Sequence, residues 1–169
     1  MASELGVNTI KHTNGTDALT IDSSGNLTAP QSLVITNQPR LFVTGNYNGY
    51  VNTTPIPFPN VVIDNRSGWS TSTNTYTVPV AGDYFVSVCL GIVRTQGTNG
   101  HGFAEIQHNG NDLGYSYIEI PSGTQFGPLA VTRLFTCAAN DTIRVRWGGS
   151  GGHYYNNIRE SRLTIYMLG

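Results

Sequence analysis

The segment from residue 76 to residue 86 constrains the fold more than any other part of the chain. It reads Tyr-Thr-Val-Pro-Val-Ala-Gly-Asp-Tyr-Phe-Val, so two β-type runs meet at a corner that holds a proline and a glycine. Pro79 cannot donate a hydrogen bond to a neighbouring strand, and Gly82 permits backbone angles that other residues avoid. We therefore predict a strand that ends near Pro79, a turn, and a second strand that begins at Asp83.

Both faces of this second strand carry residues that are suited to burial. Side chains alternate between the two faces of a strand. One face would carry Tyr84, Val86, Val88 and Leu90, and the other would carry Phe85, Ser87 and Cys89. This pattern is typical of a strand inside a sandwich of two sheets.

The composition favours strands and turns over helices. The chain has 169 residues, of which 11% are charged, and Lys11 is its single lysine. Solubility therefore rests on abundant Gly, Thr, Asn and Ser. The Ser, Thr and Asn side chains compete with helical hydrogen bonding, so we expect almost no helix.

The chain divides near residue 38, which gives an N-terminal attachment arm at 1–38 and a main domain at 39–169. The arm reads as short β segments between turn clusters, and such a hairpin is marginally stable by itself in water. We therefore expect the arm to be buried against its own domain, a sister subunit or another protein. The residues expected at that contact are Leu5, Val7, Ile10, Leu19, Ile21 and Leu27.

From Pro39 onward, candidate strands recur at short intervals with Gly, Asn and Pro between them. They are 40–44, 47–51, 57–63, 74–79, 83–92, 102–108, 113–119, 128–137, 142–147 and 161–168. This spacing predicts an all-β antiparallel sandwich or jelly roll. The glycine-rich run 148–152 is expected to be a flexible connection, because it lacks the Gly-Lys-Ser/Thr ending of a phosphate loop.

An ordered set of motifs runs through this domain. It comprises Phe58 to Asn65, Gly68-Trp69, Thr75 to Val86, Ile106 to Gly110, and Leu134 to Val145 with Asn140-Asp141 inside it. With these motifs, residues 40–169 resemble the complement C1q-like domain, a branch of the tumour necrosis factor-like jelly rolls. The resemblance implies a ten-stranded jelly roll that forms a tight homotrimer. The chain departs from the family's pattern in the run Leu163 to Leu168, which lacks a usual glycine, and in having no collagen-like stalk.

The arm resembles a different class of protein. The phrases Leu5 to Lys11 and Asn14 to Thr28 are similar to the short N-terminal segments of tailed-phage virion proteins, especially fibre-like and decoration proteins. This resemblance implies docking on another virion protein, such as a major capsid or tail protein. It also implies a location on the virion surface after synthesis in the host cytoplasm.

The charge distribution argues against nucleic acid as a partner. The net charge is -1, and phosphate binding needs clustered Lys and Arg. Arg144 and Arg146 alternate with apolar residues and are interpreted as the outer face of one strand, paired with acidic groups. No apolar run is long enough for a membrane span, and no signal peptide is recognised, so we expect no membrane insertion.

We find no catalytic constellation and expect no enzyme activity, cofactor or metal. His12, His101, His108 and His153 show no metal-ligand spacing, and Cys89 and Cys137 are interpreted as buried free thiols without a nearby histidine. Sequence alone does not show whether a carboxylate pair forms in space. The candidates are Asp83, Glu105, Asp112, Glu119 and Asp141. For calcium, Asp64-Asn65, Asn109 to Asp112 and Asn140-Asp141 offer oxygen ligands, but turn formation explains these residues.

Aromatic residues near Asn and Gly are candidates for contact with carbohydrate or protein. They are Tyr47, Tyr50, Trp69, Tyr115, Tyr117, Trp147, Tyr154 and Tyr155. For each one, a position in the core or at a trimer axis is the alternative. Tyr154, Tyr155, Asn156 and Asn157 form the favoured candidate receptor contact.

Three functional hypotheses follow. The first is a non-enzymatic phage virion structural protein, a homotrimeric surface knob that decorates or cements the capsid or forms a short tail knob. The second is a receptor-binding tail-fibre tip that recognises host surface glycan. The third is a glycan-cleaving virion enzyme. The arm is too short to form a fibre shaft, since 38 residues span at most roughly 130 Å when fully extended and contain no repeat.

Overall fold

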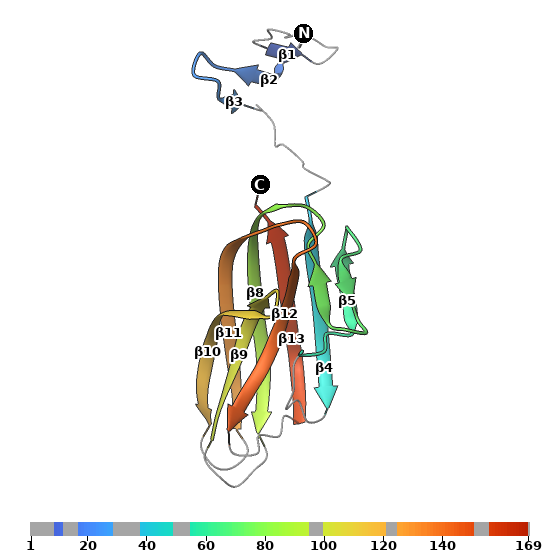
Figure 1. Cartoon of the computed structure of the whole chain (residues 1–169), viewed down its shortest axis with the longest axis vertical. Helices are drawn as coiled ribbons and strands as arrows, with labels where there is room; N and C mark the ends of the chain where they lie inside the picture. Colours follow the sequence, from blue (N-terminus) through green and yellow to red (C-terminus); the bar gives the residue numbers. More distant parts are fainter. Residues whose placement is uncertain are drawn as a thin grey trace. The chain divides into compact units, whose positions relative to one another are not determined.

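The computed structural model describes residues 9–11, 17–28, 38–48, 55–94, 100–120, 125–150 and 156–168. The chain divides into two compact units, Met1–Thr36 and Asn37–Gly169 (Figure 1). The described residues form strands, turns and bends without a helix, as the composition predicts. Within these ranges no helix has the length and apolar character needed to cross a membrane.

The smaller unit contains a three-stranded antiparallel sheet. Its strands are β1 (Thr9–Lys11), β2 (Asp17–Ile21) and β3 (Leu27–Thr28), in the order β1-β2-β3. The turn between β2 and β3 is organised by Asp22, whose Oδ1 accepts hydrogen bonds from the backbone N–H groups of Ser24 and Asn26 at 2.8 and 2.9 Å. Gly25 lies in this turn with a φ of 82°, a conformation that favours glycine.

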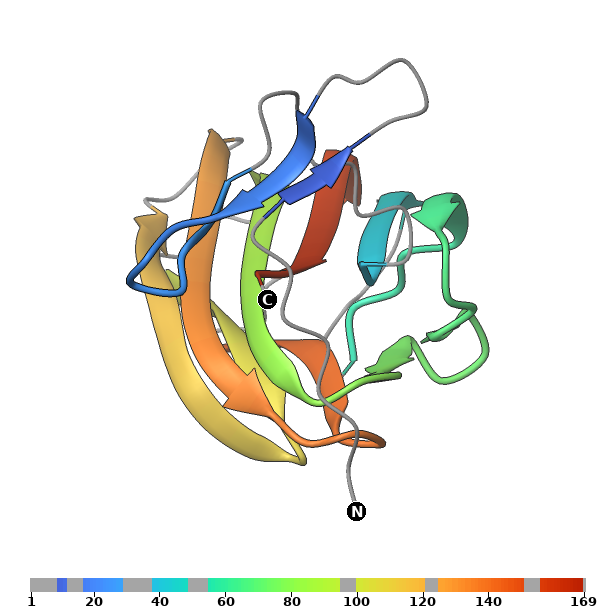
Figure 2. The ribbon, with the colours of Figure 1, turned by 90° about the horizontal axis from the view of Figure 1, so that it is seen from above.

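The larger unit is a sandwich of two antiparallel sheets. Its strands are β4 (Arg40–Asn48), β5 (Asn60–Asp64), β6 (Trp69–Ser70), β7 (Thr75–Thr77), β8 (Gly82–Arg94), β9 (Gly100–His108), β10 (Asn111–Ile120), β11 (Gln125–Cys137), β12 (Thr142–Ser150) and β13 (Asn156–Met167). Within the described residues, the β8 sheet has the order β11-β8-β13-β4-β5 and the β9 sheet has the order β10-β9-β12-β7-β6. In Figure 2, which looks down on the sandwich, β11, β8, β13 and β4 follow one another in one layer.

The predicted corner carries the chain from one sheet to the other. It leaves β7 in the β9 sheet and enters β8 in the β8 sheet. The Val78 N–H donates to the carbonyl of Asp141, and the Asn140 N–H donates to the carbonyl of Val78, each at 2.8 Å. The Tyr84 hydroxyl donates to the carbonyl of Val80 at 2.7 Å, so a core side chain also holds the turn in place.

The core lies between the sheets and follows the predicted alternation. In β8, Tyr84, Val86, Val88 and Leu90 are buried, whereas Phe85, Ser87 and Cys89 on the opposite side are partly exposed. The wider core is apolar and also includes Leu41, Val43, Ile56, Phe58, Tyr76, Val78, Ile106, Ile143, Val145, Leu163 and Ile165. Complete burial of one such aliphatic side chain contributes about 1.5–3 kcal/mol.

The strand boundaries differ from the prediction at several places. One strand, β4, continues through the gap predicted at 45 and 46; β5 begins at Asn60 rather than residue 57; and β6 was not predicted. The prediction that 148–152 is a flexible connection is wrong for its first part. Gly148–Ser150 belongs to β12, and Gly148 pairs with Phe103 of β9. A Cβ on Gly148 would overlap the Phe103 ring, so the glycine serves close packing there.

Replacing Tyr84 with Phe tests how much the hydroxyl stabilises the crossing. The change removes the bond to the Val80 carbonyl and leaves the ring in the core, so we expect unfolding free energy to fall by about 1–2 kcal/mol. Guanidinium unfolding at equal protein concentration measures the loss. Tyr115→Phe, at an exposed position, is the control and is expected to stay within about 0.5 kcal/mol of the natural chain. Equal stability of the two variants would contradict this role.

Candidate functional site

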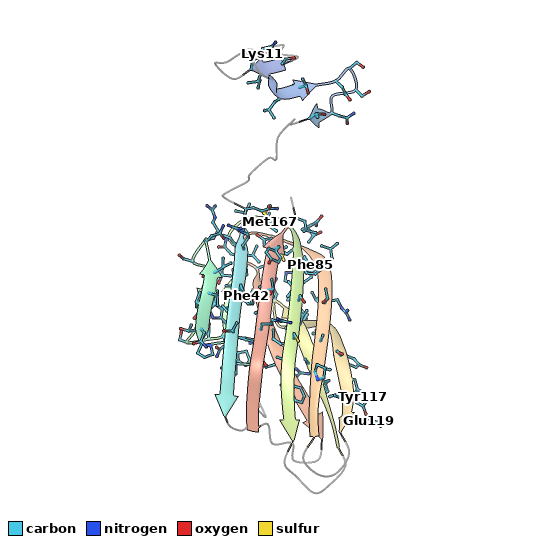
Figure 3. The ribbon with its side chains drawn as sticks, turned by 180° about the vertical axis from the view of Figure 1, so that it is seen from behind. Lys11, Phe42, Phe85, Tyr117, Glu119 and Met167 are labelled. Atoms are coloured by element: carbon cyan, nitrogen blue, oxygen red, sulfur yellow. The ribbon has the colours of Figure 1, made fainter. Side chains whose placement is uncertain are left out.

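The outward side of the β8 sheet carries two cross-strand rows of side chains. The strand register places Leu134, Phe85 and Tyr166 in one row across β11, β8 and β13. The adjacent row crosses five strands and consists of Thr132, Ser87, Thr164, Phe42 and Ile63. Figure 3 shows this sheet in front, with Phe42 on β4 and Phe85 on β8. We call these eight residues the uncharged face.

The apolar residues of this face are exposed to solvent or half-buried in the single chain. Leu134 is 61% exposed, Tyr166 and Ile63 are also exposed, and the two phenylalanines are half-buried. Charged residues border this face. The first row continues on β4 into Arg40, which lies opposite Tyr166, and Asp83 accepts a hydrogen bond from the Thr136 hydroxyl at 2.5 Å in the next row. An exposed apolar patch with a polar margin is typical of a protein-binding surface.

The outer side of the β9 sheet is different, because it combines aromatic rings with paired charges. A hollow of about 230 Å³ is lined by Phe103, Glu105, Tyr115 and Tyr117, and we call it the aromatic hollow. Tyr115 is 63% exposed, and its ring lies 5.9 Å from that of Phe103 at an interplanar angle of 58°. The Tyr117 hydroxyl donates to Glu119 at 3.2 Å on the same strand (Figure 3).

Arg146 organises the charges beside the aromatic hollow. Its Nε lies 2.5 Å from Oε2 of buried Glu105, a Nη lies 3.8 Å from Oδ2 of Asp112, and its guanidinium carbon lies 5.8 Å from the Phe103 ring centre. The hydrogen bond that Arg146 donates to the Glu105 carboxylate raises the pKa of Arg146. The pKa of Asp112 is lowered, first by the 2.7 Å hydrogen bond from Gln107 and also by Arg146.

These contacts confirm the predicted pairing for Arg146, while Arg144 differs. The Nε of Arg144 donates to the amide oxygen of Gln107 at 2.7 Å, so this contact is with a neutral group. A glycosidase needs one carboxyl group whose pKa is raised so that it can donate a proton. Asp112 is shifted in the opposite direction, and Glu105 is bound to a guanidinium group. The lowered pKa of Asp112 is therefore the reverse of what a proton-donating carboxyl group requires.

The structure brings together three residues that the sequence left apart. His108 Nε2 lies 2.7 Å from Asp141 Oδ2, and Cys137 joins them in a group whose ligand atoms all lie within 4.8 Å of one another. The interpretation that Cys137 has no nearby histidine is therefore wrong. The three positions span 33 residues, and the pairing of His108 with Ile143 in β9 and β12 brings them close. Sequence spacing contains no direct signal of that pairing.

The predicted receptor contact at residues 154–157 lies largely outside the described residues. Tyr154 and Tyr155 lie outside the described residues, and for Asn156 and Asn157 the structure describes only their place in β13. Of the other aromatic candidates, Trp147 is buried in the core, and Trp69 packs against the core with its ring 6.2 Å from that of Phe58. The exposed candidates with described side chains are Tyr115 and Tyr117.

The predicted attachment residues are partly described. Ile10 and Ile21 are exposed, and Leu19 is half-buried within the smaller unit. Leu5 and Val7 lie outside the described residues, and Leu27 is described only as part of β3. Their contact with another protein stays a prediction.

Comparison with known proteins identifies the fold. No family model matches the chain, and no curated protein matches its sequence. Among solved structures, the globular domain of zebrafish complement 1qA matches with a TM-score of 0.62 at 12% identity, over 79% of this chain and 98% of that one. Eiger TNF from S. frugiperda gives 0.61 at 11% identity, over 78% and 93% of the two chains.

A third structure, murine APRIL, gives a TM-score of 0.58 at 13% identity, over 78% of this chain and all of that one. The larger unit therefore has the C1q/TNF-like jelly-roll fold that the sequence predicts. At such low identity the similarity concerns the fold alone.

Proposed function

We propose that this protein is a non-enzymatic structural protein of a phage virion. It forms a homotrimeric knob through its larger unit and docks on the particle through its N-terminal arm. The observation that carries the proposal is the uncharged face on a C1q/TNF-like jelly roll. The phage context is supported by the arm's resemblance to the N-terminal segments of tailed-phage virion proteins.

The uncharged face provides a physical reason for self-association. Leu134, Phe85 and Tyr166 leave apolar surface in water in the single chain. Removing such surface from water stabilises an assembly by roughly 25 cal/mol per Å². The hydroxyl groups of Thr132 and Ser87 lie 3.3 Å apart and form a hydrogen bond. These two groups therefore need fewer hydrogen bonds from a partner subunit when they are buried. If three copies turn this face toward a common axis, each copy buries its row of Leu134, Phe85 and Tyr166.

The arm supports the attachment part of the proposal. It is a separate unit with its own small sheet, and Ile10 and Ile21 expose apolar side chains there. A trimer presents three such arms to a repetitive particle surface. After one arm binds, the others bind at high effective concentration, so release is slow even when each contact is weak. This favours capsid decoration or cementing, or a short tail knob, over a long fibre.

A charge placed on the uncharged face tests the trimer. Leu134→Glu introduces a carboxylate where three copies meet, while the side chain is already 61% exposed in the single chain. We expect the natural chain to have the mass of three subunits at micromolar concentration and the variant the mass of one, measured by light scattering.

Tyr115→Glu is the matched control for this test. Tyr115 is 63% exposed but lies on the other sheet, so this variant should remain trimeric. A natural chain with the mass of a monomer, or a Leu134→Glu variant with an unchanged trimer mass, contradicts assembly through this face.

Charges on the arm test attachment. In Ile10→Glu combined with Ile21→Glu, two exposed apolar side chains become carboxylates. We expect the variant to remain trimeric and to lose binding to particles that lack the protein, as measured by co-sedimentation. Imaging of labelled natural protein should show copies over the whole head if it decorates the capsid. Signal confined to the tail would exclude decoration, and undiminished binding of the double variant would exclude attachment through these residues.

The aromatic hollow favours a second candidate function, recognition of host surface glycan. Tyr115 and Phe103 offer ring faces against which a sugar can stack, and Glu105, Asp112 and Arg146 supply charged hydrogen-bonding groups beside them. In this case the same trimer would serve as a receptor-binding tip. The aromatic hollow then replaces the predicted contact at residues 154–157 as the preferred position for the site.

A glycan array separates the two positions. We expect Tyr115→Ala to weaken binding of a captured glycan roughly two- to twelvefold, because loss of a stacking ring removes roughly 0.5–1.5 kcal/mol. Tyr154→Ala and Tyr155→Ala should leave affinity unchanged; the reverse result would return the site to 154–157. Absence of any bound glycan contradicts the receptor function, and release of reducing sugar ends from host envelope material contradicts the non-enzymatic assignment.

A further inference from the structure

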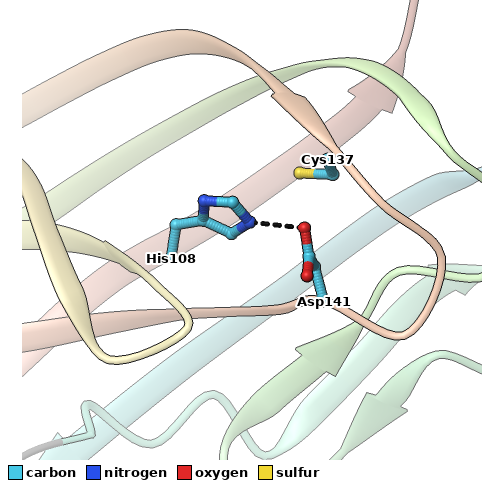
Figure 4. A group of neighbouring side chains, drawn as sticks. All are labelled: His108, Cys137 and Asp141. Carbon is cyan, nitrogen blue, oxygen red and sulfur yellow. Dashed lines mark hydrogen bonds and ion pairs between the residues drawn. The ribbon is translucent and has the colours of Figure 1, made fainter.

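Three side chains with metal-binding atoms meet where the two sheets are connected. His108 ends β9, Cys137 ends β11, and Asp141 lies in the turn before β12. One ligand atom from each lies within 4.8 Å of the others. Figure 4 shows His108 and Asp141 joined by their hydrogen bond, with the Cys137 sulfur beside them. Their distant places in the sequence explain why ligand spacing did not reveal the group.

The three atoms form a donor set that suits zinc. Zinc takes nitrogen, sulfur and carboxylate oxygen ligands, usually four in a tetrahedron. Calcium and magnesium instead prefer oxygen ligands and larger or stricter coordination shells. A group with one imidazole, one thiol and one carboxylate therefore discriminates against both, and water can complete a tetrahedron around zinc.

Zinc coordination requires side-chain movements of up to roughly 1 Å, because the three ligand atoms lie within 4.8 Å of one another and a tetrahedron brings them closer. At zinc bond lengths of 2.0–2.3 Å, neighbouring ligand atoms in a tetrahedron lie roughly 3.4–3.6 Å apart. His108 Nε2 and Asp141 Oδ2 are now 2.7 Å apart, so these two atoms must separate by roughly 0.7 Å. The side chains of His108 and Asp141 are 22% and 19% exposed, which gives an ion a route from solvent. Cys137 is buried and closes the inner side.

Surrounding groups already hold the carboxylate in position. Asp141 Oδ1 accepts a hydrogen bond from the Asn109 amide at 2.7 Å, and Oδ2 accepts one from the Ala138 N–H at 2.8 Å. The Phe135 ring lies 5.2 Å from the imidazole and limits its movement. Groups of this kind, which orient the ligands from outside, are characteristic of metal sites.

Zinc binding at this group would release a proton to solvent, because a cysteine that coordinates zinc does so as a thiolate. The positive charge of the ion would lie between the sulfur and the Asp141 carboxylate and would offset the repulsion between them.

We propose that His108, Cys137 and Asp141 bind Zn²⁺, with water as the fourth ligand. This proposal departs from the sequence analysis, which expects no metal because the histidines lack metal-ligand spacing. Its role is to fix the ends of β9 and β11 and the turn before β12 to one another. It acts as a structural clamp in each subunit and is independent of the proposed trimer contact, since Cys137 points to the core side of the β8 sheet.

Thermal unfolding of the full-length, metal-depleted chain with added ZnCl₂ tests the proposal. At a hundredfold excess over the dissociation constant we expect the midpoint to rise by roughly 5–10 °C. CaCl₂ and MgCl₂ should leave it unchanged. Replacing zinc by Co²⁺ should give the visible absorption of four-coordinate cobalt together with a thiolate-to-metal charge-transfer band.

His108→Gln is the main variant, because its amide can still donate to Asp141 and preserve the fold. It should abolish the zinc-dependent shift and the cobalt spectrum, and Cys137→Ala should abolish the charge-transfer band. Cys89→Ser is the matched control, since Cys89 is the other free thiol and lies on the opposite side of the β8 sheet; it should behave as the natural chain does. No midpoint shift in the natural chain, or a full shift in His108→Gln, would overturn the proposal.

Discussion

Two of the crossings between the sheets hold each other by backbone hydrogen bonds, and the start of two central strands depends on that contact. One is the passage from β7 in the β9 sheet to β8 in the β8 sheet, and the other is the passage from β11 in the β8 sheet to β12 in the β9 sheet. Two backbone hydrogen bonds join Val78 with Asn140 and Asp141, so each turn supplies partners for the other. With these ends fixed, strands β8 and β12 begin in defined positions, and the alternation of their side chains determines which residues fill the core.

The same junction accounts for the position of the His108, Cys137 and Asp141 group. Asp141 accepts the Val78 N–H through its carbonyl and the His108 ring through its carboxylate. The sequence analysis treats Asp141 only as a turn former. In the structure it links the backbone that follows β7 to the His108 side chain at the end of β9. Local patterns describe the turn correctly, but they do not contain this second contact.

The fold was predictable because its signals are local. Proline and glycine at the corner, alternating residues in β8 and regular turns indicated a sandwich, and the motif order indicated a C1q/TNF-like jelly roll. The sites were less predictable because they arise from register between distant strands. Leu134 joins Phe85 only through β11 pairing, and Tyr115 meets Phe103 across β10 and β9. Gly148 was misassigned because its close approach to Phe103 is a packing requirement, whereas glycine runs usually indicate loops.

The absence of charge from the two rows on the β8 sheet also determines how an assembly through them would respond to ionic strength. Salt screens attraction between exposed charges over about 10 Å at 0.1 M, so contacts built on ion pairs weaken in brine. Rows of leucine, phenylalanine, tyrosine, isoleucine and hydroxyl groups contain no such pairs to screen. A trimer formed through this surface, as proposed, would therefore depend little on salt concentration.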